Sequence, residues 1–231
     1  MKEAKKSQPA AKARGRVLIV DDHPIMRQGL AQLIKHEADL IVCGEAENAR
    51  QAMEAIAQGK PDLVLADISL PDKNGLELIK DIQALHPGLP VLVLSMHDES
   101  LYAERVLRAG GRGFIMKEEG GKKLMEAIRQ VLGGQVYVSG KMSAKILEVF
   151  SGHRAASARP SVEQLTDREF EVFQHIGRGL STSQIAEKLH ISVKTVEVHR
   201  VNIKTKLQLK TAPELMLHAV RWMEFQSASA K

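Results

Sequence analysis

The chain has 231 residues, of which 44% are hydrophobic and 26% charged, and its formal net charge is +5 at pH 7. This length is typical of two domains, and the composition excludes a wholly disordered chain. The single cysteine, Cys43, excludes an internal disulfide and a cysteine-rich zinc module, and no apolar run approaches the ~18 residues of a membrane span. No apolar stretch follows the basic start of the chain, which excludes a secretory signal, so we expect a cytoplasmic protein without membrane contact.

Charge is distributed unevenly along the chain. Residues 1–15 carry five Lys or Arg against one Asp or Glu, and we expect them to form a basic flexible tail. Residues 16–139 carry 14 basic and 18 acidic residues, whereas residues 140–231 carry 14 basic and 9 acidic ones. A basic last third indicates binding to a polyanion, and ordinary surface charge is the alternative explanation.

Five short apolar runs recur in the first half of the chain, and none of them alternates with polar residues. They lie at residues 17–20, 40–43, 63–66, 91–94 and 114–116. Continuous runs of this length are typical of strands buried on both faces, as in a parallel sheet. The stretches between them have helical periodicity, and the first has apolar positions at Ile25, Leu30, Leu33 and Ile34. This alternation predicts a flavodoxin-like, doubly wound (βα)5 domain of the α/β class over residues 16–137.

Residues 138–161 are predicted to form a linker that contains one short helix. Apolar periodicity marks this helix within residues 140–150, and residues 151–161 are small and polar. Every later pattern is helical, and three pairs fit the capping box that starts a helix: Thr166 with Glu169, Ser181 with Gln184, and Thr211 with Glu214.

The last third of the chain is therefore predicted to be an all-α domain over residues 162–227. Its four helices are expected at residues 167–177, 182–189, 193–207 and 211–225. The short joint at residues 190–192 suits a helix-turn-helix.

Polar residues follow four of the five apolar runs directly. They are Asp21 and Asp22, Asp67, Ser95 and Lys117. In the strand order 2-1-3-4-5 these four runs are neighbours, and functional groups gather at the carboxyl ends of such strands. Three carboxylates placed together repel one another and need a cation, and oxygen ligands suit Mg²⁺. An aspartate flanked by a metal, a lysine and a hydroxyl is arranged to accept a phosphoryl group.

Each of these residues alone has a plainer explanation, as a helix cap, a turn residue or a surface charge. Their joint placement at four strand ends favours the functional interpretation.

Several motifs carry a resemblance to a known family. VLIVDDHP at residues 17–24, DLVLADISLP at residues 62–71 with Asn74-Gly75, and GFIMK at residues 113–117 resemble a response-regulator receiver domain. LTDRE at residues 165–169, Ile185-Ala186, ISVKTV at residues 191–196 and His199 resemble a LuxR-type helix-turn-helix. Together they are similar to the NarL/FixJ class of two-component transcription regulators over about residues 16–225.

The resemblance implies a role for each matching position of the first domain. Asp67 is the implied phosphoacceptor, which a sensor histidine kinase phosphorylates. The residues implied to contact or respond to the phosphoryl group are Lys117, Ser95 and Phe114, the last two as a switch. The implied Mg²⁺ ligands are Asp21, Asp22, Asp67 and the backbone carbonyl of Ser69. Such a receiver is not an enzyme for external substrates and catalyses only its own phosphotransfer and dephosphorylation.

The sequence departs from the class at few positions. Asp72 and Lys73 occupy the loop before Asn74, and Gly111 stands where the class usually has alanine. These changes concern loop geometry.

A rotation of 100° per residue predicts the two sides of the helix at residues 193–207. Val196, Ile203 and Leu207 fall on one side, which we expect to face the domain core. Valines on the opposite side suit thymine methyl groups in a major groove, and lysines suit the phosphate backbone. The predicted contacts to promoter DNA are Lys194, Thr195, Val198, Val201, Asn202 and Lys206. The alternative is a basic surface helix with two incidental valines.

The last predicted helix carries two apolar stripes. Leu215, Ala219 and Trp222 form the first, and Met216, Val220 and Met223 form the second. The second stripe predicts a homodimer contact, formed when the protein is phosphorylated or bound to DNA. The alternative is one wide arc that faces the core.

Two other function classes compete with a phosphorylated DNA-binding regulator. Aspartyl-phosphate phosphatases place an acidic residue two positions after the nucleophile, but here that position is Ser69. A nucleotide-binding flavodoxin-like module is the other alternative, but the sequence has no G-x-G-x-x-G or P-loop motif.

Overall fold

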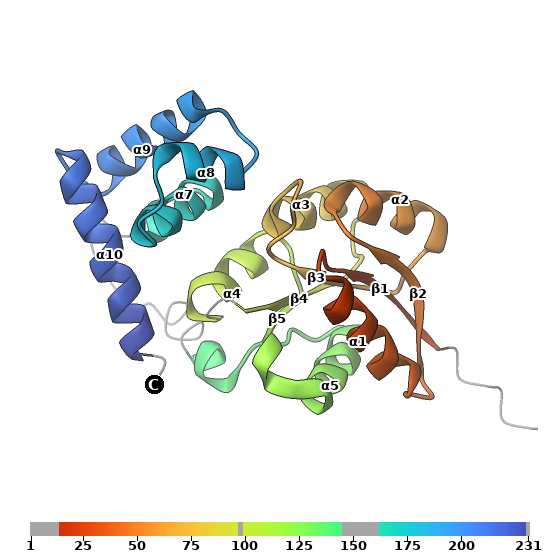
Figure 1. Ribbon diagram of the computed structural model, residues 1–231. Helices are drawn as coiled ribbons and strands as arrows, with labels where there is room; N and C mark the ends of the chain where they lie inside the picture. The colour runs from red at the N-terminus through yellow and green to blue at the C-terminus, as the bar shows by residue number, and fades with distance from the viewer. Residues whose placement is uncertain (1–13, 97–98, 145–161, 230–231) are drawn as a thin grey trace, which may run out of the picture. The chain divides into compact units, whose positions relative to one another are not determined.

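The computed structural model describes residues 14–96, 99–144 and 162–229, and it forms two compact units, Met1–Leu147 and Glu148–Lys231 (Figure 1). Each unit is described by itself. Residues 140–144 are helical, and the rest of the predicted linker and the predicted basic tail up to residue 13 lie outside the described residues. Among the residues described, no helix combines the length and apolarity needed to cross a membrane.

The first unit is built on a parallel sheet with the strand order β2-β1-β3-β4-β5, as predicted. The strands are β1 Gly15–Val20, β2 Leu40–Ala46, β3 Leu63–Asp67, β4 Val91–Ser95 and β5 Gly113–Met116. The helices are α1 Pro24–Lys35, α2 Ala49–Gly59, α3 Gly75–Leu85, α4 Glu99–Arg108, η1 Lys117–Glu119 and α5 Gly120–Leu132. Helices α1 and α5 cover one face of the sheet, and α2, α3 and α4 cover the other (Figure 1).

Burial differs from the sequence pattern at two places. Every residue of β3 and β4 is buried, but the middle of β2 is partly exposed, and Ile41 is 40% exposed. Strand β2 lies at the edge of the sheet, and an apolar run does not tell an edge strand from a central one. In α1, Leu30 and Ile34 are buried, whereas Ile25 and Leu33 lie on the exposed side.

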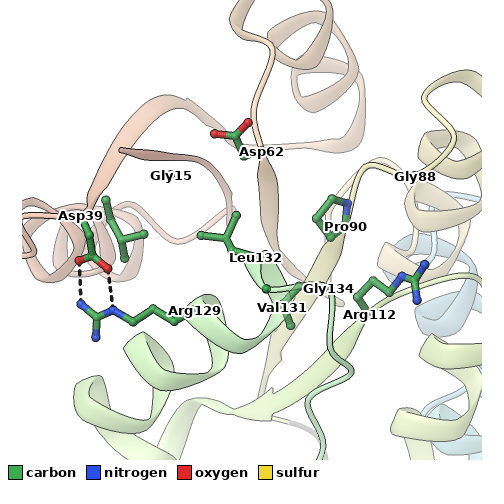
Figure 2. Close-up of a pocket in the computed structure, with 12 residues that line it drawn as sticks. Gly15, Asp39, Asp62, Gly88, Pro90, Arg112, Arg129, Val131, Leu132 and Gly134 are labelled. Carbon is green, nitrogen blue, oxygen red and sulfur yellow. Dashed lines mark hydrogen bonds and ion pairs between the residues drawn. The ribbon is translucent and has the colours of Figure 1, made fainter. Parts of the chain in front are cut away.

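A hollow of about 850 Å³ opens where the strands begin, at the end of the sheet opposite Asp67 (Figure 2). Its lining includes the starts of β1 and β2 and the residues just before β3, β4 and β5. Two of its charged side chains form an ion pair, in which the Arg129 guanidinium donates to both carboxylate oxygens of Asp39 at 2.8 Å. In open parallel sheets ligands bind at the carboxyl ends of the strands, which lie at the other end of this sheet.

Over its described residues, 162–229, the second unit contains four helices, as predicted, after a short 3₁₀ turn. They are η2 Val162–Gln164, α7 Asp167–Gly177, α8 Thr182–Lys188, α9 Val193–Lys206 and α10 Ala212–Ser229. The capping boxes at Thr166 and Ser181 are confirmed. The third predicted box, at the start of α10, is half formed. The Thr211 hydroxyl accepts a hydrogen bond from the Glu214 amide, but the Glu214 carboxylate accepts one from the Lys210 amide instead of the Thr211 amide.

Aromatic packing and a short turn fix the arrangement of these helices. Phe170 and Phe173 of α7 each meet the Trp222 ring edge to face at a centroid distance of 5.6 Å. Between α8 and α9, His190 takes a left-handed φ of 50°, and the Ile191 amide donates to the carbonyl of Ala186 at 3.0 Å. This reversal lets α9 begin directly after α8, as a helix-turn-helix requires.

Candidate functional site

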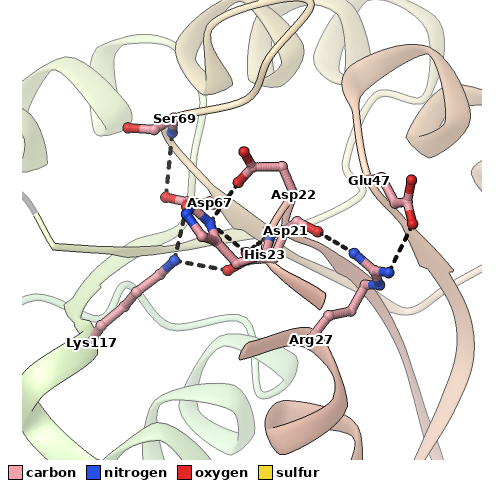
Figure 3. A network of polar contacts seen from close by, with 8 residues as sticks. All are labelled: Asp21, Asp22, His23, Arg27, Glu47, Asp67, Ser69 and Lys117. Carbon is pink, nitrogen blue, oxygen red and sulfur yellow. Dashed lines mark hydrogen bonds and ion pairs between the residues drawn. The ribbon is translucent and has the colours of Figure 1, made fainter. Parts of the chain in front are cut away.

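The carboxyl ends of β1 and β3 bring an acidic cluster together (Figure 3). Asp21 and Asp67 are 1% and 5% exposed. One ligand atom from each of Asp21, Asp22, His23 and Asp67 lies within 4.8 Å of the others. Parallel strands end at the same edge, so the order of the sheet alone places these side chains together.

Lys117 neutralises part of this cluster from the end of β5. Its ammonium group donates to Asp21 Oδ2 and to Asp67 Oδ2, each at 2.8 Å. Burial acts to lower the pKa of Lys117, but the hydrogen bonds to the two carboxylates outweigh it, and the pKa is raised. Lys117 is therefore a fixed positive charge between the two carboxylates.

Burial disfavours the ionised form of the Asp67 carboxylate. Burial raises the pKa of Asp67 more than the Lys117 hydrogen bond lowers it. The Ser69 amide donates to Asp67 Oδ1 at 3.3 Å. Additional positive charge near Asp67 would favour its ionised form.

The cluster fits a hard divalent cation. Asp22 Oδ1 is buried and lies 2.7 Å from His23 Nδ1, but this approach lacks hydrogen-bond geometry. Among the described residues this oxygen has no hydrogen-bond partner. A buried carboxylate oxygen left without a donor, beside two more carboxylates, is the donor set that Mg²⁺ prefers.

Ser95 lies on β4, the strand next to that of Asp67, and Phe114 lies on β5, one strand further along the sheet. Ser95 ends β4, one residue beyond Leu94, which pairs with Asp67 in the sheet. Phe114 of β5 pairs with Val93 of β4. Ser95 and Phe114 are both 0% exposed, so any rotamer change of Phe114 requires its neighbours to move.

The loop that follows Asp67 is closed at its base. The Gly75 amide donates to the Ile68 carbonyl at 2.8 Å. A Cβ at Gly75 would lie 2.7 Å from the backbone oxygen of Asp67, so only glycine permits this approach. Asp72, one of the departures from the family pattern, accepts hydrogen bonds from the first two amides of α2. The loop that carries Ser69 is thereby tied to a second helix.

The sequence pattern did not single out Arg27 of α1. Its guanidinium donates to the backbone carbonyl of Asp21 at 2.8 Å and to Glu47 (Figure 3). It also donates to Glu45. The only signal in the sequence is an arginine one turn into the helix that follows Asp22. Its partners become visible only in three dimensions.

Helix α9 separates a buried side from an exposed one. Val196 and Ile203 are 0% exposed, as the rotation analysis predicts. On the other side Val198 and Val201 are 52% and 55% exposed. The further exposed polar side chains of the predicted DNA contact set are Lys194, Thr195 and Asn202.

Lys206, a predicted phosphate contact, has a partner within its own domain. Its ammonium group bonds the carboxylate of Glu169 at 2.7 Å, and Glu169 is 4% exposed. Lys206 is the last residue of α9, and its long stem reaches back to the capping box of α7. The ion pair engages the ammonium group within the domain, while the Lys206 side chain stays 34% exposed.

The Glu169–Lys206 pair predicts how the helical domain responds to acid. Burial acts to raise the pKa of Glu169, but the hydrogen bonds from Lys206 and Thr166 lower it overall. A lowered folded pKa stabilises the fold above the unfolded pKa of about 4.3, and this contribution is lost as pH falls through the folded pKa. We therefore expect Glu169→Gln to lower the melting temperature near neutral pH and to reduce the loss of stability in acid.

Thermal denaturation of parent and variant across this pH range measures the effect. Glu224→Gln, on the exposed side of α10, is the control and should change little. A Glu169→Gln variant with the same loss of stability at every pH would contradict the assignment.

The two stripes of α10 differ in burial. Leu215 and Ala219 are 0% exposed and face α7. In the second stripe Met216 is 48% exposed and Val220 is half-buried. Met223, however, packs on the end of α7, where a Cβ at Gly177 would lie 2.7 Å from its Cγ. Part of the predicted dimer stripe thus has an intramolecular partner.

Both units match described protein families. Residues 17–129 match response regulator receiver domains, and residues 163–219 match bacterial regulatory proteins of the luxR family. Relatives include the oxygen regulatory proteins NreC of Staphylococcus haemolyticus and Staphylococcus aureus. They are 34% and 35% identical over 210 residues, which cover 89% of this chain and 97% of each relative.

Solved structures agree with this match. A LuxR-family two-component response regulator from Aurantimonas sp. SI85-9A1 is 30% identical, with a TM-score of 0.56 over 60% of this chain and 99% of that chain. The RcsB response regulator of Salmonella typhimurium is 24% identical, with a TM-score of 0.66 over 90% of this chain and 98% of that chain. At that identity the RcsB likeness concerns the fold alone.

Proposed function

The chain belongs to the response regulators that join a receiver domain to a LuxR-type DNA-binding domain, and from this we propose that phosphorylation of Asp67 controls its binding to promoter DNA. The phosphoryl donor is the phosphohistidine of a sensor kinase. The carboxylate of Asp67 attacks the phosphorus, the phosphorus–nitrogen bond breaks, and an acyl phosphate forms on Asp67.

The observation that carries this proposal is the position of Lys117 between two buried carboxylates. Its bonds to Asp21 and Asp67 at 2.8 Å place a fixed positive charge where phosphoryl oxygens would arrive. Mg²⁺ would be held by Asp21, Asp22, Asp67 and the Ser69 carbonyl, and when bound it supplies further positive charge to those oxygens. Ser95, on the neighbouring strand, is the candidate hydroxyl donor to the new phosphate.

The exposed side of α9 is the proposed DNA surface. Val198 and Val201 would meet thymine methyl groups, and Asn202 would bond a base edge or a phosphate. Lys194 and Thr195, in the first turn of α9, would contact phosphates. Lys206 is left out of this set because it is paired with Glu169.

We place the homodimer contact of the DNA-binding domains on the exposed part of α10. Met216 and the half-buried Val220 are the residues that support it. Met223 is left out because it packs on Gly177 of its own domain.

A phosphatase that hydrolyses external phosphoesters is the competing function. Ser69 stands where such an enzyme needs an acid, and the described cluster offers no second acidic group beyond the cation ligands. With Mg²⁺, we expect acetyl phosphate to label the chain at one position and p-nitrophenyl phosphate to release no phosphate beyond the background. Many turnovers of the ester would favour the enzyme.

Promoter binding is tested by selection. Genomic fragments recovered with the acetyl phosphate-treated full chain should share a sequence element, and recovery of fragments at random would contradict a promoter-specific regulator.

A further inference from the structure

We infer that Arg27 is a positioning residue for the cation site, an inference that rests on the proposed function. Its side chain is 12% exposed and makes three hydrogen bonds. Nη1 donates to the backbone carbonyl of Asp21 at 2.8 Å, Nε to Glu45 at 3.3 Å and Nη2 to Glu47 at 2.9 Å. The bond to Asp21 fixes the peptide group that joins the two aspartates of the cluster.

The other bonds around Asp21 explain why this carbonyl matters. The Asp21 amide continues the sheet by donating to Ala46 at 3.1 Å, and Asp21 Oδ1 accepts the His23 amide at 2.8 Å. Because the Asp21 carbonyl is bonded to Arg27, both the amide and the carbonyl of Asp21 are held by hydrogen bonds. The direction of the following residue, Asp22, depends on the orientation of this peptide group. The guanidinium is planar and its N–H groups have fixed directions, so its bonds to Glu45 and Glu47 also set the direction of the N–H group that meets the Asp21 carbonyl.

The two glutamates also offset the charge of Arg27. A guanidinium beside a cation site would repel the cation. Glu45 and Glu47 lie on or just after the end of β2, and both contact the guanidinium. Arg27 therefore holds the Asp21 carbonyl without adding a net positive charge.

The same sheet offers a matched control at its other end. Arg129 of α5 also bridges two carboxylates near the start of β2, that of Asp39 (Figure 2) and that of Glu37. Its bonds lie at the end of the sheet opposite Asp21 and Asp67, where the hollow opens. Arg27→Met and Arg129→Met thus remove the same charge and contacts to two carboxylates each, but only Arg27→Met removes a bond to the Asp21 carbonyl.

The test is the affinity of the unphosphorylated full chain for Mn²⁺ alone, read by electron paramagnetic resonance of the free ion. We expect Arg27→Met to weaken Mn²⁺ binding roughly tenfold, and Arg129→Met to change it by less than about twofold. A pure charge effect has the opposite sign, because loss of a positive charge would tighten binding. Unchanged or tighter Mn²⁺ binding by Arg27→Met would overturn the inference.

Two further variants keep the test decisive. Arg27→Lys retains the charge without the fork, and we expect it to bind Mn²⁺ several-fold more weakly than the parent. If Arg27→Met does not fold, an Arg27→Lys variant that binds Mn²⁺ as tightly as the parent would overturn the inference. A parent chain that binds no Mn²⁺ would instead overturn the cation site of the proposed function.

Discussion

Replacement of Asp67 by asparagine is expected to abolish labelling of the chain by acetyl phosphate and Mg²⁺. The amide is not a nucleophile, and it is a poorer ligand for a hard cation than a carboxylate. Intact-mass spectrometry measures the result, because the acyl phosphate adds a single phosphoryl group to the parent. Asp81→Asn, on the surface of α3 and paired with Lys73, is the control and should be labelled as the parent is.

The same substitution has a second expected effect, on stability without metal. Burial raises the pKa of Asp67, so the folded state disfavours its ionised form. For such a group the free energy of unfolding falls as pH rises above the unfolded pKa, and the cost is complete above the folded pKa. Asp67→Asn removes this cost and should melt at a higher temperature than the parent in EDTA near neutral pH. Full labelling of the variant, or a lower melting temperature in EDTA, would contradict the role given to this buried carboxylate.

The second large effect is expected on DNA binding when the charge of Lys194 is reversed. A unit charge about 4 Å from a phosphate in water contributes about 1 kcal/mol, so reversal costs about 2 kcal/mol, or roughly thirtyfold in affinity. Because phosphates are alike in every sequence, Lys194→Glu should weaken binding to all fragments alike. It should also flatten the salt dependence by about one ion. Lys35→Glu, on the exposed side of α1, carries the same charge change and is the control.

The valines of α9 should behave in the opposite way. Val198→Ala and Val201→Ala remove methyl groups that would touch thymine, so they should alter the preference among sites without changing the salt slope. Fluorescence anisotropy with matched and mismatched fragments at several salt concentrations separates the two effects. Valine variants that rank every fragment as the parent does would show that this side of α9 does not read bases.

Much of the fold and of the acidic cluster could be predicted because short-range sequence patterns determine them. An apolar run followed by a polar residue places Asp21, Asp67, Ser95 and Lys117 at strand ends, and the strand order then brings the ends together. The capping boxes at Thr166 and Ser181 are local in the same sense, which explains why the starts of α7 and α8 were predicted to the residue.

The remaining features depend on contacts between distant segments. The exposure of Ile41 follows from the edge position of β2, which its own sequence does not reveal. Lys206 and Arg27 have long side chains whose partners, Glu169 and the Asp21 carbonyl, are fixed by tertiary packing. Helical rotation gives the side of a helix on which a residue lies, but not what its terminal charge reaches.

The central claim, that phosphorylation of Asp67 controls DNA binding, is tested most directly by the affinity of the full chain for one selected promoter fragment. Affinity is measured with and without acetyl phosphate and Mg²⁺, for the parent and for Asp67→Asn. Phosphorylation changes the affinity for DNA only if DNA binds the phosphorylated and unphosphorylated forms with different free energies. A difference of ~2 kcal/mol would correspond to a change in affinity of roughly thirtyfold. We predict that the donor raises the affinity of the parent and leaves Asp67→Asn unchanged. An equal response of both proteins, or no response of the labelled parent, would contradict the claim.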